Sequence, residues 1–242
     1  MVSFPKPDLN CDLGEIDPTL SLEAEIMPLI HRCNIACGGH AGGDEMIKGC
    51  ILLAKENKVL IGAHPSYPDK VNFGRVSMNI DPKELKETLT EQINKVLISC
   101  TQNSYPMTYV KAHGALYHDV AYRAELALIF ASLIKDLGDF EVMGPPDSSL
   151  ELICKNLNLV YLREAFADRK YTSQGRLLPR KVPGAVLVNL KEIIAQCDAL
   201  INKNLLQVMA GKSINLDCDS ICVHSDTDHS LQILKEIKKT FF

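Results

Sequence analysis

Seven short apolar segments alternate with longer amphipathic segments, and this alternation constrains the fold more than any other feature of the sequence. Several of the short segments are almost continuously apolar, which is typical of strands covered on both faces in a parallel sheet. The predicted strands are Asp8–Leu13, Cys33–Cys37, Val59–His64, Thr108–His113, Phe140–Met143, Val160–Ala165 and Ser220–His224.

The amphipathic segments between them have the length and periodicity of helices. The clearest begins at Asp81-Pro82, where aspartate can cap the helix and proline suits its first position. The predicted helices are Leu20–His31, Asp44–Asn57, Pro82–Cys100, Arg123–Leu137, Ser148–Asn156, Leu190–Asn202 and Thr227–Thr240.

A β-α order repeated seven times predicts an α/β fold with a parallel sheet, either a closed barrel or an open doubly wound sheet. No linker or change of composition divides the 242 residues, so we expect a single domain over residues 1–242. Residues 166–183 form a long connection rich in Arg, Lys and Gly, and a loop of this length in a compact domain is often functional.

Composition excludes several classes of protein. The formal net charge of −4 argues against a general nucleic-acid or anionic-membrane binder, and no apolar run approaches the length of a transmembrane helix. The first residues lack the basic start and apolar stretch of a signal peptide, so we expect a cytoplasmic protein. The nine scattered cysteines are then interpreted as small buried apolar residues rather than disulfides or a structural zinc site.

Polar and ionisable residues gather where the predicted strands end. The carboxyl ends of parallel strands meet at one rim, so these groups are expected to share one site. Lys111 lies in an apolar strand and, if buried, needs a carboxylate partner. Asp12, His40 and His64 have the residue types of a divalent metal site, but a hydrogen-bonded network without metal fits them as well. We assign no function to the histidines in or beside helices, which are His31, His118 and His229.

The residues at the strand ends form longer motifs, and together these resemble the LamB/YcsF family. The motifs occur in family order between residues 8 and 227, which makes the resemblance far more specific than any short pattern. They are DLNCDLGE from Asp8, NIACGGHAG from Asn34, GAHPSYPD from Gly62, FGR from Phe73, VKAHGALY from Val110, EAFADRKY from Glu164, LPR from Leu178 and ICVHSDT from Ile221.

The resemblance implies a (β/α)7 TIM-like barrel of the glycoside hydrolase/deacetylase type. It also implies a hydrolase that opens 5-oxoproline to glutamate at the expense of ATP, with Mg²⁺ as the ATP counter-ion, in an assembly with two further subunits, B and C. Because no usual nucleotide-binding loop is visible in the sequence, we expect part of the ATP site to lie on another subunit. The motif residues carried over are Asp12, Glu15, His40, His64, Lys111, His113, Asp168, Arg169, Arg180, His224 and Asp226.

Our hypothesis for this chemistry gives Asp12 or Glu15 the role of general base and His64 or His113 acid–base work. Lys111, the fifth expected catalytic residue, and Arg169 would contact anions. The residues expected to bind substrate or phosphate are Asn10, Asn34, Arg169, Arg180, His224 and Asp226.

Two alternatives remain open. One is a metal-dependent deacetylase or other hydrolase of carbohydrate, with Asp12, His40 and His64 as ligands. The other is a non-catalytic subunit that binds 5-oxoproline and presents it to its partners. The sequence also departs from the family pattern at Gly39, Ala112 and Ser225, which affects loop shape but removes no ionisable group.

Overall fold

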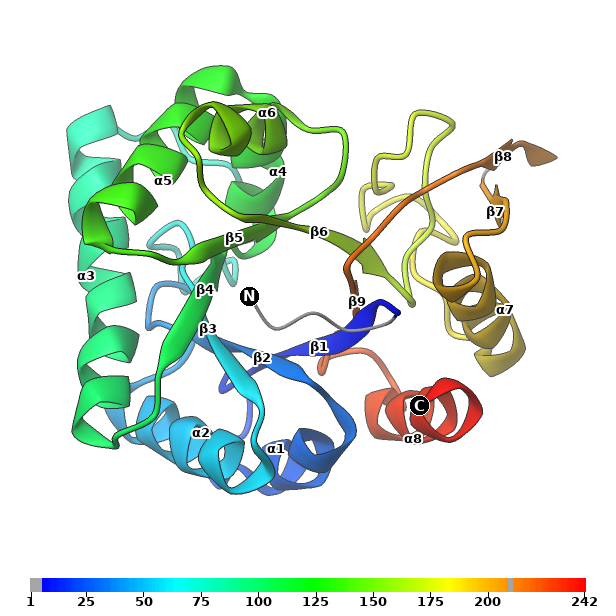
Figure 1. The fold of residues 1–242 in the computed structure, drawn as a ribbon, viewed down its shortest axis with the longest axis horizontal. Coiled ribbons are helices and arrows are strands. Elements are labelled where there is room, and N and C mark those ends of the chain that lie inside the picture. Colours follow the sequence, from blue (N-terminus) through cyan, green and yellow to red (C-terminus); the bar gives the residue numbers. More distant parts are fainter. Residues whose placement is uncertain (1–5, 209–210) are drawn as a thin grey trace.

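The computed structural model describes residues 6–208 and 211–242, and it contains a closed barrel of seven parallel strands. Neighbouring strands pair in the order β1-β2-β3-β4-β5-β6-β9, and β9 closes the barrel against β1 (Figure 1). The closed barrel is therefore the correct alternative of the two that the sequence left open. The barrel strands are β1 (Asp8–Leu13), β2 (Arg32–Ala36), β3 (Leu60–His64), β4 (Met107–Lys111), β5 (Glu141–Gly144), β6 (Tyr161–Phe166) and β9 (Ser220–Cys222).

The helices form a layer around the barrel (Figure 1). The structure has a helix at each of the seven predicted places, and most of their ends agree to within a few residues. The helices are α1 (Ser21–Ile26), α2 (Asp44–Asn57), α3 (Pro82–Gln102), α4 (Gly114–Tyr122), α5 (Ala124–Leu137), α6 (Ser149–Asn156), α7 (Leu190–Ile201) and α8 (Ser230–Phe241).

Two differences from the predicted helices have local causes. The first predicted helix is shorter, because α1 changes at Met27–Leu29 into a 3₁₀ turn, η1, that contains Pro28. Proline has no N–H for an α-helical hydrogen bond. Helix α4 was not predicted, although it follows β4 directly. At the start of α3, the Asp81 side chain accepts hydrogen bonds from two backbone N–H groups, as the sequence predicts.

Apolar and polar side chains alternate along the strands more than the nearly continuous apolar runs of the sequence predict. In β1, Leu9, Cys11 and Leu13 belong to the main apolar core. Asp8, Asn10 and Asp12 bond with polar groups of other strands inside the barrel. The barrel interior is therefore largely polar, and its separate apolar cluster consists of Tyr109, Met143 and Leu162.

A buried charge network lies beside the amino-terminal ends of the strands. Arg32 donates to Asp8 at 2.6 Å and to Glu141 at 3.1 Å, and the Ser220 hydroxyl donates to the second oxygen of Asp8. Burial lowers the pKa of the Arg32 guanidinium, but the charge and hydrogen bond of Asp8 together with its other neighbours outweigh burial and raise that pKa. The guanidinium thus stays charged and links three strands at the end of the barrel opposite the site described below.

Two longer connections leave the barrel after β6. Residues 167–189 lie between β6 and α7, and a small antiparallel pair, β7 (Leu206–Gln207) and β8 (Ser213–Ile214), precedes β9. The first of these connections supplies several residues to the site. All nine cysteines are buried and unpaired, as predicted.

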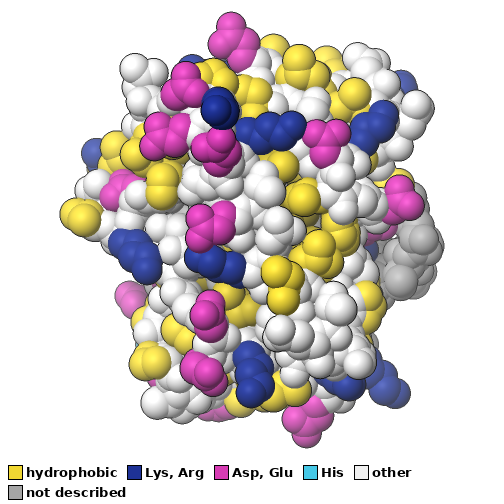
Figure 2. All heavy atoms as spheres, turned by 90° about the vertical axis from the view of Figure 1, so that its left-hand side faces the viewer, with side chains coloured by type: hydrophobic (Ala, Val, Ile, Leu, Met, Phe, Trp, Pro, Cys, Tyr) yellow, Lys and Arg dark blue, Asp and Glu magenta, His cyan; other side chains and the backbone are white. Residues whose placement is uncertain are grey.

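The outer face on the α3 side carries acidic and basic side chains interspersed with single apolar ones (Figure 2). Lys95 pairs with Glu91 along α3, and Lys86 of α3 pairs with Asp136 of α5. Such a mixed surface is ordinary for helices that face solvent. Within the described ranges, no helix is both long and apolar enough to cross a membrane.

Candidate active site

A cavity of about 450 Å³ lies where the barrel strands end. Nine of the residues predicted for the site line it, and they come from segments up to 214 residues apart in the sequence. The nine are Asp12, Glu15, His64, Lys111, His113, Arg169, Arg180, His224 and Asp226.

Lys111 has the carboxylate partners that its buried position requires. Its ammonium lies 2.8 Å from Asp12 Oδ1 and 2.7 Å from Glu164 Oε1. Burial disfavours the charged lysine, but Asp12 and its other neighbours raise its pKa well above the usual value. Burial likewise opposes ionisation of Asp12, but His64 and Lys111 hold its pKa well below the usual range. Asp12 is therefore a fixed anion and a poor proton acceptor.

Asn10 and Asn34, which we expected to bind substrate, lie one layer deeper. Both are completely buried and do not line the cavity. Asn34 donates to Asn10 Oδ1 and to Asp12 Oδ1, and it accepts from the Tyr109 hydroxyl. Since the barrel interior occupies these hydrogen-bonding groups, the two asparagines hold Asp12 in place from below.

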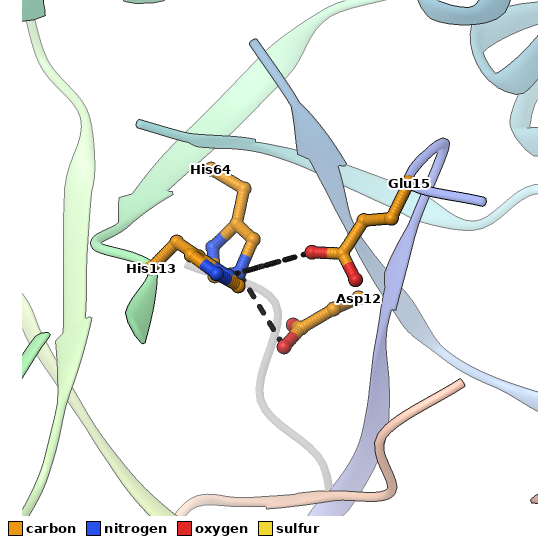
Figure 3. Close-up of side chains that lie close together, drawn as sticks. All are labelled: Asp12, Glu15, His64 and His113. Atoms are coloured by element: carbon orange, nitrogen blue, oxygen red, sulfur yellow. Dashed lines mark hydrogen bonds and ion pairs between the residues drawn. The ribbon is translucent and has the colours of Figure 1, made fainter. Parts of the chain in front are cut away.

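His64 and His113 face each other at the bottom of the cavity (Figure 3). His64 Nδ1 donates to the Lys111 carbonyl at 2.8 Å, and His113 Nε2 donates to the Phe73 carbonyl at 3.0 Å. The other two ring nitrogens, His64 Nε2 and His113 Nδ1, are 3.1 Å apart. Burial, together with the neighbouring His40 and His64, lowers the pKa of His113 well below its usual range.

Glu15 extends from the loop after β1 toward these imidazoles. Its Oε1 lies 3.4 Å from His113 Nδ1 and 4.0 Å from His64 Nε2 (Figure 3). Burial and the nearby Asp12 carboxylate raise the pKa of Glu15 to about 7. A carboxylate with such a pKa can take up and release a proton near neutral pH, so Glu15 suits the role of general base better than Asp12.

His40 lies behind this group rather than within it. Its Nε2 is 2.9 Å from Glu15 Oε1, and its ring stacks on that of His113 with centroids 3.6 Å apart. The donor atoms of Asp12, Glu15, His64 and His113 all lie within 4.8 Å of one another, and His40 is not part of that group. The geometry therefore favours a different set from the predicted Asp12, His40 and His64.

On the β9 side, Asp168 orients His224. The carboxylate of Asp168 accepts from His224 Nδ1 at 3.0 Å and from the Thr227 hydroxyl at 2.6 Å. Burial opposes ionisation of Asp168, but His224 outweighs it and lowers the carboxyl pKa to about 2. His224 stacks on Phe166, so its position is fixed on two sides.

Three arginines make part of the cavity lining cationic, and we call this part the arginine wall. Arg75, Arg169 and Arg180 line it, and Asp226 pairs with both Arg75 and Arg180. Burial and the charge of Arg180 lower the pKa of Arg169 to about 10. The buried Nε of Arg169 has no hydrogen-bond partner among the described residues. This wall therefore has more positive charge than its own carboxylate compensates.

Sequence reasoning missed several residues of the site. His118, which we assigned no function, lines the cavity from the unpredicted helix α4. Arg75 and Glu164 lie within the quoted motifs but were not among the expected site residues. Glu164 could have been predicted from the sequence, because a buried Lys111 needs carboxylate partners and Glu164 is a carboxylate at the end of another predicted strand.

The departure at Gly39 has a steric explanation. A Cβ atom there would lie 2.3 Å from Gln92 Oε1 and 2.5 Å from Ser66 Oγ. Gln92 accepts from the Ser66 backbone N–H and donates to the Ser66 carbonyl. Glycine thus allows Gln92 to hold the loop after β3, close to His64.

The chain is similar to known proteins over nearly its full length. Residues 7–241 match the model of the LamB/YcsF family. The A subunit of a 5-oxoprolinase from Haemophilus influenzae (strain PittEE) is 37% identical over 233 residues, which cover 96% of this chain and 94% of the relative. The A subunit of a 5-oxoprolinase from Staphylococcus epidermidis (strain ATCC 35984) is also 37% identical, over 236 residues with the same coverage.

A solved structure has the same fold. The lactam utilization protein from Thermus thermophilus superposes with a TM-score of 0.89 at 28% identity, and the match covers 97% of this chain and 95% of that one. The fold is therefore shared over nearly the full length of both chains.

Proposed function

The chain belongs to the LamB/YcsF family, and from this premise we propose that it is the A subunit of an ATP-dependent 5-oxoprolinase. In this reaction the lactam ring of 5-oxo-L-proline opens to L-glutamate while ATP is hydrolysed to ADP and phosphate. The observation that carries the proposal is one cavity whose lining includes both a proton acceptor, Glu15, and three arginines.

The arginine wall fits the anionic parts of such a reaction. Arg169 and Arg180 can bind a carboxylate through paired N–H groups, and Arg169 has a buried Nε that no described residue satisfies. We assign this wall to the carboxylate of 5-oxoproline or to the phosphate transferred from ATP. His224, held by Asp168, lies beside it as a further hydrogen-bonding group.

The part of the lining that holds Glu15, His64 and His113 fits the hydrolytic step. An amide is a poor electrophile, and phosphorylation of the lactam oxygen would convert it into an activated imidate. Water would then add to the ring carbon, and the C–N bond would break as the ring nitrogen takes up a proton, which leaves an acyl phosphate. A second water would hydrolyse this acyl phosphate to L-glutamate and inorganic phosphate. Glu15 serves as the base for the water and then delivers the proton to the ring nitrogen. Lys111 keeps Asp12 ionised beside His64.

We propose ATP, with Mg²⁺ as its counter-ion, as the co-substrate, and companion subunits B and C as partners. The cavity's own cations can contact a phosphate, and the rest of the nucleotide is assigned to one of these companions. We place the protein in the cytoplasm, because nine buried, unpaired cysteines suit a reducing compartment.

Isothermal titration of the isolated chain with 5-oxoproline, followed by single-turnover analysis of the assembly, tests this proposal. We expect the chain to bind 5-oxoproline and Arg169→Met to weaken binding. If the chain binds 5-oxoproline but Glu15→Gln leaves turnover by the assembly unchanged, the chain would instead only present the substrate to its partners.

A further inference from the structure

The two imidazoles at the bottom of the cavity are arranged as ligands for a cation. His64 and His113 each donate one ring N–H to a backbone carbonyl, which fixes the tautomer of a neutral ring. When both rings are neutral, the nitrogens without a proton are His64 Nε2 and His113 Nδ1, which lie 3.1 Å apart. Two lone pairs at this distance repel each other unless a positive charge lies between or beside them. A backbone carbonyl behind each imidazole is also the usual second contact of a metal-binding histidine.

Asp12 supplies a third donor. Its Oδ1 is occupied by Lys111 and Asn34, while Oδ2 lies 3.4 Å from His64 Nε2. Zinc lies about 2.0–2.1 Å from nitrogen and oxygen ligands, so the edges of its coordination tetrahedron measure roughly 3.3–3.4 Å. The separation of 3.4 Å between Asp12 and His64 equals such an edge, and the separation of 3.1 Å between the two imidazole nitrogens is slightly shorter than one.

Glu15 lies on the side of this group that faces the cavity. Its Oε1 already accepts from His40 Nε2, and it lies 3.4 Å from His113 Nδ1. All four side chains belong to one group of donors within 4.8 Å, and all four line the cavity. A water molecule bound to a cation here would therefore be exposed to Glu15 and to a ligand in the cavity.

We propose that Asp12, His64 and His113 bind one divalent transition-metal ion of the zinc class, with its fourth position directed at Glu15 and the cavity. Two imidazoles with one carboxylate favour Zn²⁺, Mn²⁺ or Co²⁺ over Mg²⁺, which prefers oxygen ligands. The ion goes beyond the proposed lactam opening, which needs no metal at these residues. Such an ion would lower the pKa of its bound water and so provide the nucleophile that Glu15 deprotonates.

The test is calorimetric titration of the isolated, chelator-treated chain with Zn²⁺ alone. We expect one equivalent to bind, with protons released when the titration is repeated in buffers of different ionisation enthalpy. His64→Gln and His113→Gln should each weaken binding by more than about 100-fold, which exceeds the usual effect of losing a residue that only supports a ligand. The exposed His229 is the matched control, and His229→Asn should leave the affinity unchanged.

A spectroscopic readout protects the test against variants that fold poorly. Co²⁺ bound to the wild-type chain should give the intense visible bands of a four-coordinate ion, and these bands should disappear on addition of Zn²⁺. Absence of Zn²⁺ binding by the wild-type chain, or binding unaffected by both histidine changes, would overturn the inference. Metal binding is measured on the isolated chain, so its failure is distinct from a failure of 5-oxoproline turnover in the assembly.

Discussion

The ammonium of Lys111 lies 2.8 Å from the carboxylate of Asp12, although the two residues are 99 positions apart in the sequence. Both side chains are almost completely buried, at 2% and 6% exposure. Parallel strands β1 and β4 direct their carboxyl ends to the same rim, and this is what brings the two charges together. The pair keeps the Asp12 carboxylate ionised next to His64, so this contact made by the fold also sets a charge in the site.

Removal of the lysine should destabilise the fold strongly. In Lys111→Met, Asp12 and Glu164 would remain buried without their cation, and loss of one partner from a buried pair costs about 3–5 kcal/mol. Urea denaturation measures the change. Lys95→Met, which removes an exposed pair with Glu91, is the control and should cost less than about 1 kcal/mol. Equal effects of the two changes would contradict the importance of the buried charge.

Glu15 should make stability depend on pH in an unusual direction for a carboxyl group. Burial raises its pKa from 4.5 to about 7, so the folded chain holds this proton more tightly than the unfolded chain. The resulting stabilisation is fully present below pH 4.5 and is lost as the pH rises through about 7. Glu15→Gln, compared with wild type by denaturation of the metal-free chain from pH 4 to 8, should lack this loss.

The pH dependence of the reaction rate of the assembly should also be set by Glu15. A base with a pKa of about 7 is protonated in acid, so kcat/KM should fall below neutral pH. Glu15→Gln should lower the rate by about 10²–10⁴-fold and abolish the fall in kcat/KM at acid pH. The exposed Glu25 is the matched control, and Glu25→Gln should preserve both rate and profile. If kcat/KM of Glu15→Gln falls at acid pH as it does in the wild type, another residue is the base.

The arginine wall should control substrate affinity. Arg169→Met and Arg180→Met each remove a cavity-lining cation, and a hydrogen bond to a charged group contributes about 1.5–3 kcal/mol. We expect the Kd for 5-oxoproline, or the KM for ATP if the wall binds phosphate, to rise by at least about 10-fold. Arg176, in the same connection, stacks on Tyr122 and is not among the residues that line the cavity. Arg176→Met should therefore bind normally, and equal losses in all three variants would refute the assignment.

Gly39 should tolerate no larger side chain without repacking. In Gly39→Ala the new methyl group would collide with Gln92 and Ser66, and overpacking of this kind costs typically about 1–3 kcal/mol. Gly43 is the control, because it has extended backbone and a Cβ there would have no neighbour within 4 Å. Thermal denaturation should show a lower Tm for Gly39→Ala and almost none of this change for Gly43→Ala.

The sequence was sufficient to predict which strand ends bring residues to this site. Strand ends are readable because short apolar runs stop at polar clusters, and parallel topology then places Asp12, His64, Lys111 and His224 at one rim. Residues of this kind are found from chain order and strand direction alone, without knowledge of any side-chain conformation.

The sequence was not sufficient for the arrangement within the rim. His40 and His113 both follow strands, yet only the second reaches His64, because loop geometry directs His40 to Glu15. Asn10 has the same inward direction in β1 as Asp12 but lies two residues deeper, so it supports the site and does not line it. His118 was assigned no function because it was taken for a histidine in or beside a helix, yet from helix α4 it lines the cavity.

The most direct test of the proposed activity is glutamate formation from 5-oxoproline and ATP by the chain together with its companion subunits. We expect ATP-dependent glutamate with the wild-type chain, none when the chain is omitted, and a loss of at least about 10²-fold with Asp12→Asn or His64→Ala. Full activity of the assembly with both variants, or without the chain, would contradict the proposal.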